Sequence, residues 1–236
     1  MNERKYVMLL IVLVTIIIFN TALILTSDEI DTSKNDYTIE TIGSNANGTV
    51  YKITAGNMSS NETVGIILGV HPREHEIHEA VNRTIYNITG ENGTNNLTKK
   101  YVIYYVMTKD NLTSRDDTRP AGEELANKFI VPKIKEDKPF IVVDVHEIDP
   151  NYEYSNFIFS LSNSTPKVES YMNKISQDVG LINFEFEEGT SPERVTKPIA
   201  KQGIPTFLVE VSIQDTTKEK QKTADKLIKS LDQLEP

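Results

Sequence analysis

Short, almost wholly apolar runs alternate with helical patterns along this chain, and that alternation limits the folds it can adopt. Residues 63–70, 140–145 and 206–211 are apolar at nearly every position, as in strands buried on both faces. Residues 76–88 and 165–179 between them are predicted helices. Strands that alternate with helices predict an α/β fold, with three αβα layers around a mainly parallel mixed sheet.

The remaining elements are predicted from shorter patterns. Further strands are expected at residues 50–54, 101–107, 157–161 and 182–186, and further helices at 122–129, 192–201 and 218–234. Thr165 and Pro166 are expected to cap the helix 165–179, and Pro198 is expected to kink or break the helix 192–201. The lysines between Lys218 and Lys229 alternate with acidic residues and predict a solvated helix face.

Charge and cysteine content exclude several classes of protein. The net charge is -9, and no basic stripe is present that would bind a nucleic-acid backbone. The chain has no cysteine, which excludes disulfides and zinc sites built on thiolates.

The N-terminus carries a long apolar segment from Tyr6 to Thr26. It is long enough to span a bilayer. Arg4 and Lys5 precede it and acidic residues follow it, so the rest of the chain is expected outside the cell. We therefore expect a cytoplasmic N-terminus at 1–5, a single-pass membrane anchor at 6–26, a polar stalk at 27–46 and a folded domain at 47–236. A cleaved signal peptide is the alternative reading.

Asn-x-Ser/Thr sequons are more frequent than chance predicts. They start at Asn47, Asn57, Asn61, Asn82, Asn87, Asn92, Asn96, Asn111 and Asn163. Their excess predicts a glycoprotein of the cell surface. The alternative is a set of Asn-rich and Thr-rich loops that carry no glycan.

The candidate metal ligands lie at strand ends. His71 follows the strand 63–70, Glu74 comes three residues later, and His146 ends the strand 140–145. Because ligands bind at the carboxyl ends of strands in such sheets, we expect these side chains to meet there. Two histidines and one carboxylate with an open fourth position are the ligand set of catalytic zinc, so Zn²⁺ is the expected cofactor.

Other polar residues near these candidate ligands are not expected to bind the metal. Asp144 is a candidate partner for a ligand, at a distance that the sequence leaves open. His75 and His78 are expected to face solvent or cap the helix. The segment is not H-E-x-x-H, so the helical metalloprotease motif is absent.

These motifs resemble the zinc carboxypeptidase superfamily, including its succinylglutamate desuccinylase and aspartoacylase branch, over about residues 64–212. His71-Pro72-Arg73-Glu74 is similar to the family's H-x-x-E, and Asp144-Val145-His146 to its D-x-H. The strand 206–211 resembles the one that carries the catalytic glutamate, here Glu210. Arg115 to Gly122 resembles the family's segment D-x-N-R-x-F-P-G, with Thr118 where Asn is usual.

The resemblance implies a zinc-dependent hydrolase for residues 47–236, acting on a peptide or acyl-amino-acid substrate. Glu210 would be the general base, and Arg115 would polarise the scissile carbonyl. Arg119 would bind a substrate carboxylate, and Arg73 would line the pocket; the order of the two roles given to Arg115 and Arg119 is left open.

Two departures from the family keep a second reading open. The family's tyrosine has no secure counterpart, Tyr152 and Tyr154 being loop candidates, and the chain has no room for the extra C-terminal domain of the aspartoacylases. The missing tyrosine and Thr118 in place of Asn favour the alternative function, a non-catalytic glycosylated surface module that retains the fold.

Overall fold

The structure is a computed structural model that describes residues 37–90, 92–149, 151–152, 154–184 and 191–236. The predicted cytoplasmic N-terminus, the anchor at 6–26 and the first part of the predicted stalk lie outside these residues. Within them, no helix has the length and apolar character needed to cross a membrane.

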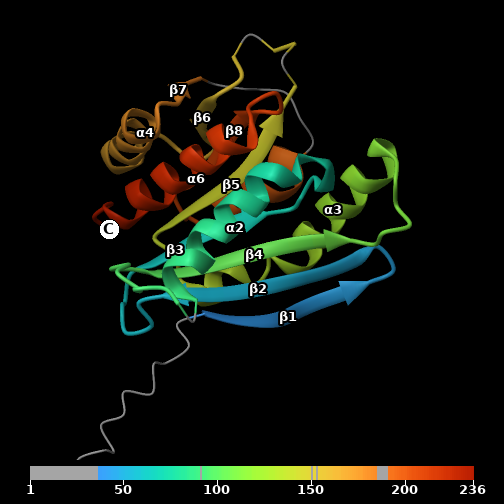
Figure 1. Ribbon diagram of the computed structural model, residues 1–236, viewed down its shortest axis with the longest axis horizontal. Coiled ribbons are helices and arrows are strands. Elements are labelled where there is room, and N and C mark those ends of the chain that lie inside the picture. Colours follow the sequence, from blue (N-terminus) through green and yellow to red (C-terminus); the bar gives the residue numbers. More distant parts are fainter. Residues whose placement is uncertain (1–36, 91, 150, 153, 185–190) are drawn as a thin grey trace, which may run out of the picture. The chain divides into compact units, whose positions relative to one another are not determined.

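One mixed sheet of eight strands forms the centre of the domain, in the order β1-β2-β4-β3-β5-β8-β6-β7 (Figure 1). The strands are β1 (Tyr37–Asn45), β2 (Gly48–Gly56), β3 (Thr63–Leu68), β4 (Lys100–Thr108), β5 (Ile141–Ile148), β6 (Phe157–Ser160), β7 (Ile182–Asn183) and β8 (Thr206–Ser212). The neighbours β4-β3, β3-β5, β5-β8 and β6-β7 are parallel, and the other three pairs are antiparallel. The carboxyl ends of β4, β3, β5 and β8 therefore share one edge of the sheet.

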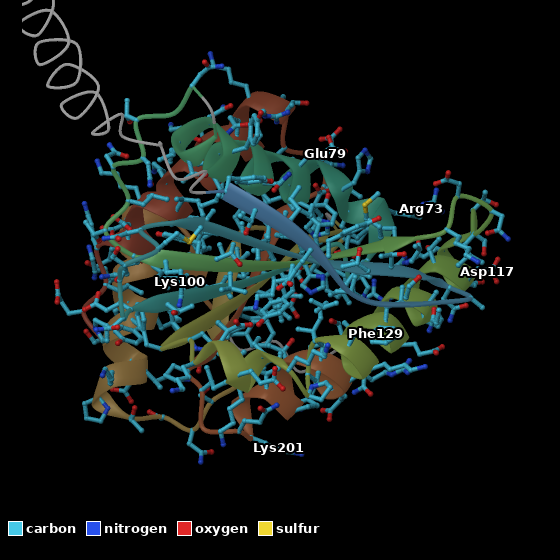
Figure 2. All side chains as sticks on the ribbon, turned by 90° about the horizontal axis from the view of Figure 1, so that it is seen from below. Arg73, Glu79, Lys100, Asp117, Phe129 and Lys201 are labelled. Atoms are coloured by element: carbon cyan, nitrogen blue, oxygen red, sulfur yellow. The ribbon has the colours of Figure 1, made fainter. Side chains whose placement is uncertain are left out.

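Helices cover both faces of the sheet. The α-helices are α2 (His75–Thr89), α3 (Arg115–Phe129), α4 (Pro166–Val179), α5 (Lys197–Ala200) and α6 (Thr217–Asp232); η1 (Pro72–Glu74) and η2 (Ile134–Asp137) are 3₁₀ helices, and η3 (Pro192–Thr196) is a π-helix. One buried core joins α2, α4 and α6 to the sheet, and a second joins α3, η3 and α5 to it. In Figure 2, Glu79 of α2 and Phe129 of α3 lie on opposite sides of the sheet.

The inner strands are buried because both of their faces are covered. All residues of β3, β5 and β8 are buried. Each large aliphatic side chain buried in this way contributes roughly 1.5–3 kcal/mol of transfer free energy. Polar side chains at the ends of these strands are held in place by that packing, which matters for the site described below.

Most predicted elements are present, and α4 begins as predicted. The Thr165 side chain accepts a hydrogen bond from the backbone N–H of Val168, and Pro166 occupies the first helical position. The predicted helix 192–201 is divided into η3 and α5, and Pro198 lies at the start of the latter.

Three expectations need correction. Residues 37–45, placed in the stalk, form β1, which pairs antiparallel with β2 because Ile39, Thr41 and their neighbours supply backbone partners for the edge of that strand. The helix α3 begins at Arg115 rather than 122, since Ser114 caps it by accepting from the N–H of Asp117. Lys220 is buried and not solvated, as it pairs with Glu76 and Glu147.

Candidate metal centre

His71 and Glu74 are positioned by the turn that follows β3. Gly69 has φ +79°, and a Cβ there would lie 2.2 Å from the carbonyl oxygen of Val106, so only glycine fits this turn. His71 then precedes η1, and Glu74 is the last residue of that short helix. The His71 Nδ1 atom lies 3.0 Å from Glu74 Oε1.

His146 reaches the same point from β5. Its Nδ1 atom lies 3.1 Å from His71 Nδ1 and 2.9 Å from Glu74 Oε2, and all three residues are buried. Donors bound to a tetrahedral zinc at ~2.0–2.1 Å lie roughly 3.3 Å apart, close to these separations. The two imidazoles and the carboxylate therefore fit a divalent metal ion, as the sequence predicted.

Each imidazole also has a carboxylate at its far nitrogen. His146 Nε2 lies 3.0 Å from Asp144 Oδ1, and His71 Nε2 lies 3.2 Å from Glu123 Oε1. Such outer carboxylates fix the tautomer and orientation of histidine ligands and make the ligating nitrogen more basic. Asp144 was a candidate for this role, whereas Glu123 was not predicted. Its one signal in the sequence is its distance of one helical turn from Arg119.

The charges of the cluster favour an ionised Glu74 carboxylate and a positive charge beside it. Burial opposes ionisation of Glu74, but the imidazoles of His146 and His71 hold its pKa well below its usual value. Burial likewise disfavours a charged His146, yet Asp144 and Glu74 outweigh it and raise the pKa of that imidazole. A site that stabilises a proton among buried carboxylates also stabilises a metal cation in its place.

Glu210 lies beside the cluster on the next strand. It is in register with His146 in the parallel pair β5-β8. Burial raises its pKa to about 8, and the negative charges of Glu74 and Asp144 add to that shift. Its Oε2 atom has no hydrogen-bond partner among the described residues. A buried carboxyl group with a free oxygen at a strand end is able to accept and release a proton.

Of the three predicted arginines, Arg119 contacts the cluster and the other two line the cleft. Arg119 Nη1 is 3.4 Å from Glu74 Oε1, and Arg119 Nε is 3.7 Å from Glu123 Oε1. Arg115, the first residue of α3, is exposed and lines the cleft. Arg73 is also exposed and borders the outer part of the cleft together with Arg115 and Arg119.

The cleft has a narrow inner part and a wider outer part. The inner cavity, of about 70 Å³, is lined by the ligands His71, Glu74 and His146 and by Glu210. An adjoining cavity of about 420 Å³ shares His71, Glu74, Arg115 and Arg119 with it. Figure 2 shows Arg73 and Asp117 at the end of the sheet that carries this cleft, and Lys100, where β4 begins, at the opposite end.

The two remaining histidines have different roles. His75 is exposed as expected. His78 is fully buried, contrary to expectation, because its Nε2–H donates to the carbonyl oxygen of Val145 at 2.8 Å. Burial lowers the pKa of His78 to about 4, so the ring is neutral, and it does not belong to the ligand cluster.

The two tyrosine candidates are separated by the fold. Tyr152 lines the inner cavity and is 41% exposed. Tyr154 packs against Phe184, with ring centroids 4.8 Å apart, and is absent from the lining of either cavity. Of the two, Tyr152 alone is placed to meet a substrate.

Solved metallo-carboxypeptidases have a similar fold. One from Burkholderia cenocepacia matches with a TM-score of 0.58 at 10% identity, over 90% of this chain and 67% of its own. One from Pseudomonas aeruginosa, in complex with (2-guanidinoethylmercapto)succinic acid, matches with a TM-score of 0.53 at 12% identity, over 90% and 67%. A succinylglutamate desuccinylase/aspartoacylase from Rhodobacter sphaeroides gives 0.52 at 13%, over 86% and 66%.

These matches confirm the suspected resemblance at the level of the fold. The chain spans about two thirds of the length of these three proteins. No protein-family model matches the sequence, and no curated protein does.

Proposed function

We propose that this domain is a zinc-dependent hydrolase that cleaves an amide bond next to a free carboxylate, in a peptide or an acyl-amino acid. The observation that carries the proposal is the position of Glu210. Its carboxyl group lines the same small cavity as His71, Glu74 and His146, with one oxygen left without a hydrogen-bond partner among the described residues. A purely structural metal site has no need of such a group.

Zinc bound to His71, Glu74 and His146 would supply Lewis acidity and lower the pKa of water towards ~7. Glu210 then accepts a proton from the attacking water and returns it to the leaving amine. A carboxyl group whose pKa lies near neutrality is suited to both transfers, because it both takes up and gives up a proton readily. Burial of the cluster keeps bulk water away from the reacting atoms.

The two arginines of α3 are proposed to act in the reverse of the order first inferred from the sequence. Arg119 contacts Glu74 and is half-buried, so it is the better placed to stabilise negative charge on the carbonyl oxygen. Arg115 is exposed at the rim, where its guanidinium is able to bind a free carboxylate through two parallel hydrogen bonds. Arg73 and Tyr152 would complete the outer wall.

The decisive experiment combines metal analysis with hydrolysis. Metal-free protein is loaded with zinc and assayed against a panel of C-terminally free peptides and N-acyl amino acids. We expect one zinc per chain and hydrolysis that a chelator abolishes. Glu210→Gln is expected to retain zinc and to lose roughly 10²–10⁴-fold in kcat. Wild-type activity in Glu210→Gln would overturn the assignment of the base.

A second candidate function is a non-catalytic surface module. Thr118 favours it, because the hydroxyl group at the position where the family has Asn donates to the carbonyl oxygen of Ser114 within its own helix. Zinc binding without hydrolysis of any substrate in the panel would support this alternative.

We also propose that the segment Tyr6–Thr26 anchors the domain outside the cell and that some sequons carry glycans. The length of the apolar segment and the charges around it support the anchor. The test is fractionation of cells that express the full chain. Protein in the membrane fraction that external protease removes from intact cells supports the proposal, and protein in the cytosolic fraction contradicts it.

A further inference from the structure

The π-helix η3 contacts the outer carboxylate of each histidine ligand. Thr196 Oγ1 donates to Asp144 Oδ2 at 2.7 Å, and Asp144 Oδ1 lies 3.0 Å from His146 Nε2. Arg194 Nη1 lies 3.5 Å from Glu123 Oε2, and the other oxygen of Glu123 is 3.2 Å from His71 Nε2. Two chains of contacts therefore run from one short helix to the two imidazoles.

We propose that η3 sets the metal affinity of the site, with Thr196 and Arg194 as positioning residues that act through Asp144 and Glu123. The inference rests on the proposed metal site but not on hydrolysis. It concerns side chains that touch neither the metal ligands nor the substrate directly. Thr196 belongs to the chain of contacts that ends at His146, and Arg194 to the one that ends at His71.

The Thr196 contact has the stronger geometry. Thr196 and Asp144 are both fully buried, so no bulk water is available to replace the hydroxyl group. The hydroxyl proton occupies one carboxylate oxygen, and the other lies 3.0 Å from His146 Nε2. Without it, the carboxylate is free to rotate away from the imidazole, and the ligand nitrogen loses both its orientation and part of its basicity.

The contact of Arg194 with Glu123 is more exposed, but the backbone around Arg194 is held by a hydrogen bond and by a buried neighbour. The carbonyl oxygen of Arg194 accepts a hydrogen bond of 2.6 Å from Asn127 Nδ2, which ties η3 to α3, the helix that carries Glu123. Val195 between the two contacts is buried in the core under the sheet. The helix η3 is therefore fixed to the body of the domain, and π-helical turns are frequent at functional sites.

The experiment measures zinc affinity directly, by competition with a chromophoric chelator on the metal-free full chain. Thr196→Val keeps the shape of the side chain and removes the hydroxyl group, so we expect zinc affinity to fall roughly 10–100-fold. Thr196→Ser restores the hydroxyl group and is expected to return affinity to within about threefold of wild type. Arg194→Gln is expected to weaken binding by roughly 3–10-fold, since its contact is longer and partly solvated.

Lys197→Gln is the matched control. Lys197 follows η3 directly, and its ion pair with Glu193 is exposed. Its substitution is expected to leave zinc affinity unchanged. A purely structural role of η3 would instead lower the melting temperature of the metal-free protein and leave zinc affinity as it is.

Unchanged affinity in a folded Thr196→Val protein overturns the proposal for Asp144. If Thr196→Val does not fold, Arg194→Gln and Thr196→Ser still test the proposal. Zinc affinity in Arg194→Gln equal to that of the Lys197→Gln control overturns the role of Arg194 through Glu123. Zinc affinity in Thr196→Ser far below that of wild type overturns the role of the Thr196 hydroxyl group. Zinc binding that responds as expected in a protein without hydrolytic activity would support this inference while the proposed function fails.

Discussion

Gly122 determines how closely α3 approaches the end of β3. A Cβ at this position would lie 2.0 Å from the carbonyl oxygen of Val70, and backbone cannot easily give way. This close approach places Glu123, the next residue, against the His71 ring. Gly122→Ala is therefore expected to destabilise the domain by about 1–3 kcal/mol and to weaken zinc binding.

The measurement for Gly122→Ala is chemical denaturation together with zinc competition. Lys128→Ala, at an exposed position of the same helix, serves as the control and should behave as wild type. Wild-type stability and zinc affinity in Gly122→Ala would mean that the approach of α3 to β3 is not required.

His78 makes the stability of the domain depend on pH. The unfolded chain binds a proton at this residue below pH ~6.5, whereas burial keeps the folded ring neutral until about pH 4. Because the unfolded state binds more protons in that window, stability contributed by neutral His78 is present above pH ~6.5 and is lost as pH falls. The loss approaches roughly 3 kcal/mol at the lower limit.

The test compares wild type with His78→Gln, both free of metal, by denaturation between pH 7 and pH 4.5. The other titrating groups are common to the two proteins, so the difference in unfolding free energy reports His78. Wild type should lose stability relative to the variant as the pH falls. Parallel pH profiles would contradict a neutral buried His78.

At this scale the sequence predicted that His71, Glu74 and His146 lie together, with Asp144 as a candidate partner, but it did not predict Glu123 or Thr196. His71, Glu74 and His146 were proposed because the ends of buried strands meet at one edge of a sheet, and Glu210 because its strand resembles the one that carries the family's catalytic glutamate. Glu123 was missed although it lies in the predicted helix 122–129, because the sequence pattern does not show that this part of the helix packs against the His71 ring. Contacts such as that of Thr196 with Asp144 depend on tertiary packing, which local pattern does not report.

Among the elements, the buried Lys220 of α6 forms ion pairs with both β5 and α2. Lys220 of α6 lies 3.1 Å from Glu147 Oε1 and 2.9 Å from Glu76 Oε2, and the same Glu147 oxygen accepts from the N–H of Ile77 in the first turn of α2. Burial opposes the charge of Lys220, but the two carboxylates outweigh it and raise the pKa of the ammonium group. The ammonium group of Lys220 is therefore charged at neutral pH, while burial raises the pKa of the Glu147 carboxyl group.

Lys220→Met is expected to destabilise the domain by about 3 kcal/mol, because it leaves Glu147 buried with no cation beside it. Lys222→Met, an exposed position of the same helix, is the control. In the double variant Lys220→Met/Glu147→Gln, part of the loss should be recovered, since no buried charge is then unpaired. Thermal denaturation measures these three proteins and the single variant Glu147→Gln, and additive losses in the double variant would contradict coupling between the two residues.

Helices and strands were predictable where apolar runs or capping residues in the sequence mark the elements that are buried in the fold. The strands β3, β5 and β8 and the capped helix α4 follow from apolar runs and from Thr165-Pro166. The strand β1 was not recognised, because an exposed edge strand has little apolar alternation and residues 37–45 are mostly polar. The buried Lys220 was read as solvated for a similar reason, since composition alone does not reveal which helical face meets the sheet.

At the scale of the whole molecule, the proposed metal ligands come from separate parts of the chain. His71 and Glu74 follow β3, His146 lies on β5, and the unfolded chain does not hold them together. A metal that binds the folded state alone stabilises it by mass action. Free zinc at about 100 times its dissociation constant would add roughly 2.7 kcal/mol.

For a domain of this size, that gain corresponds to a rise in melting temperature of roughly 5–10 °C. Calorimetry of the metal-free chain with increasing zinc tests it, because the rise must continue with the logarithm of the free zinc concentration. His146→Asn replaces the imidazole with a smaller polar side chain and removes a proposed ligand. The melting temperature of this variant should therefore rise far less when zinc is added. An equal shift in that variant would locate the zinc elsewhere, since coupling of metal binding to folding through β3 and β5 requires both histidines.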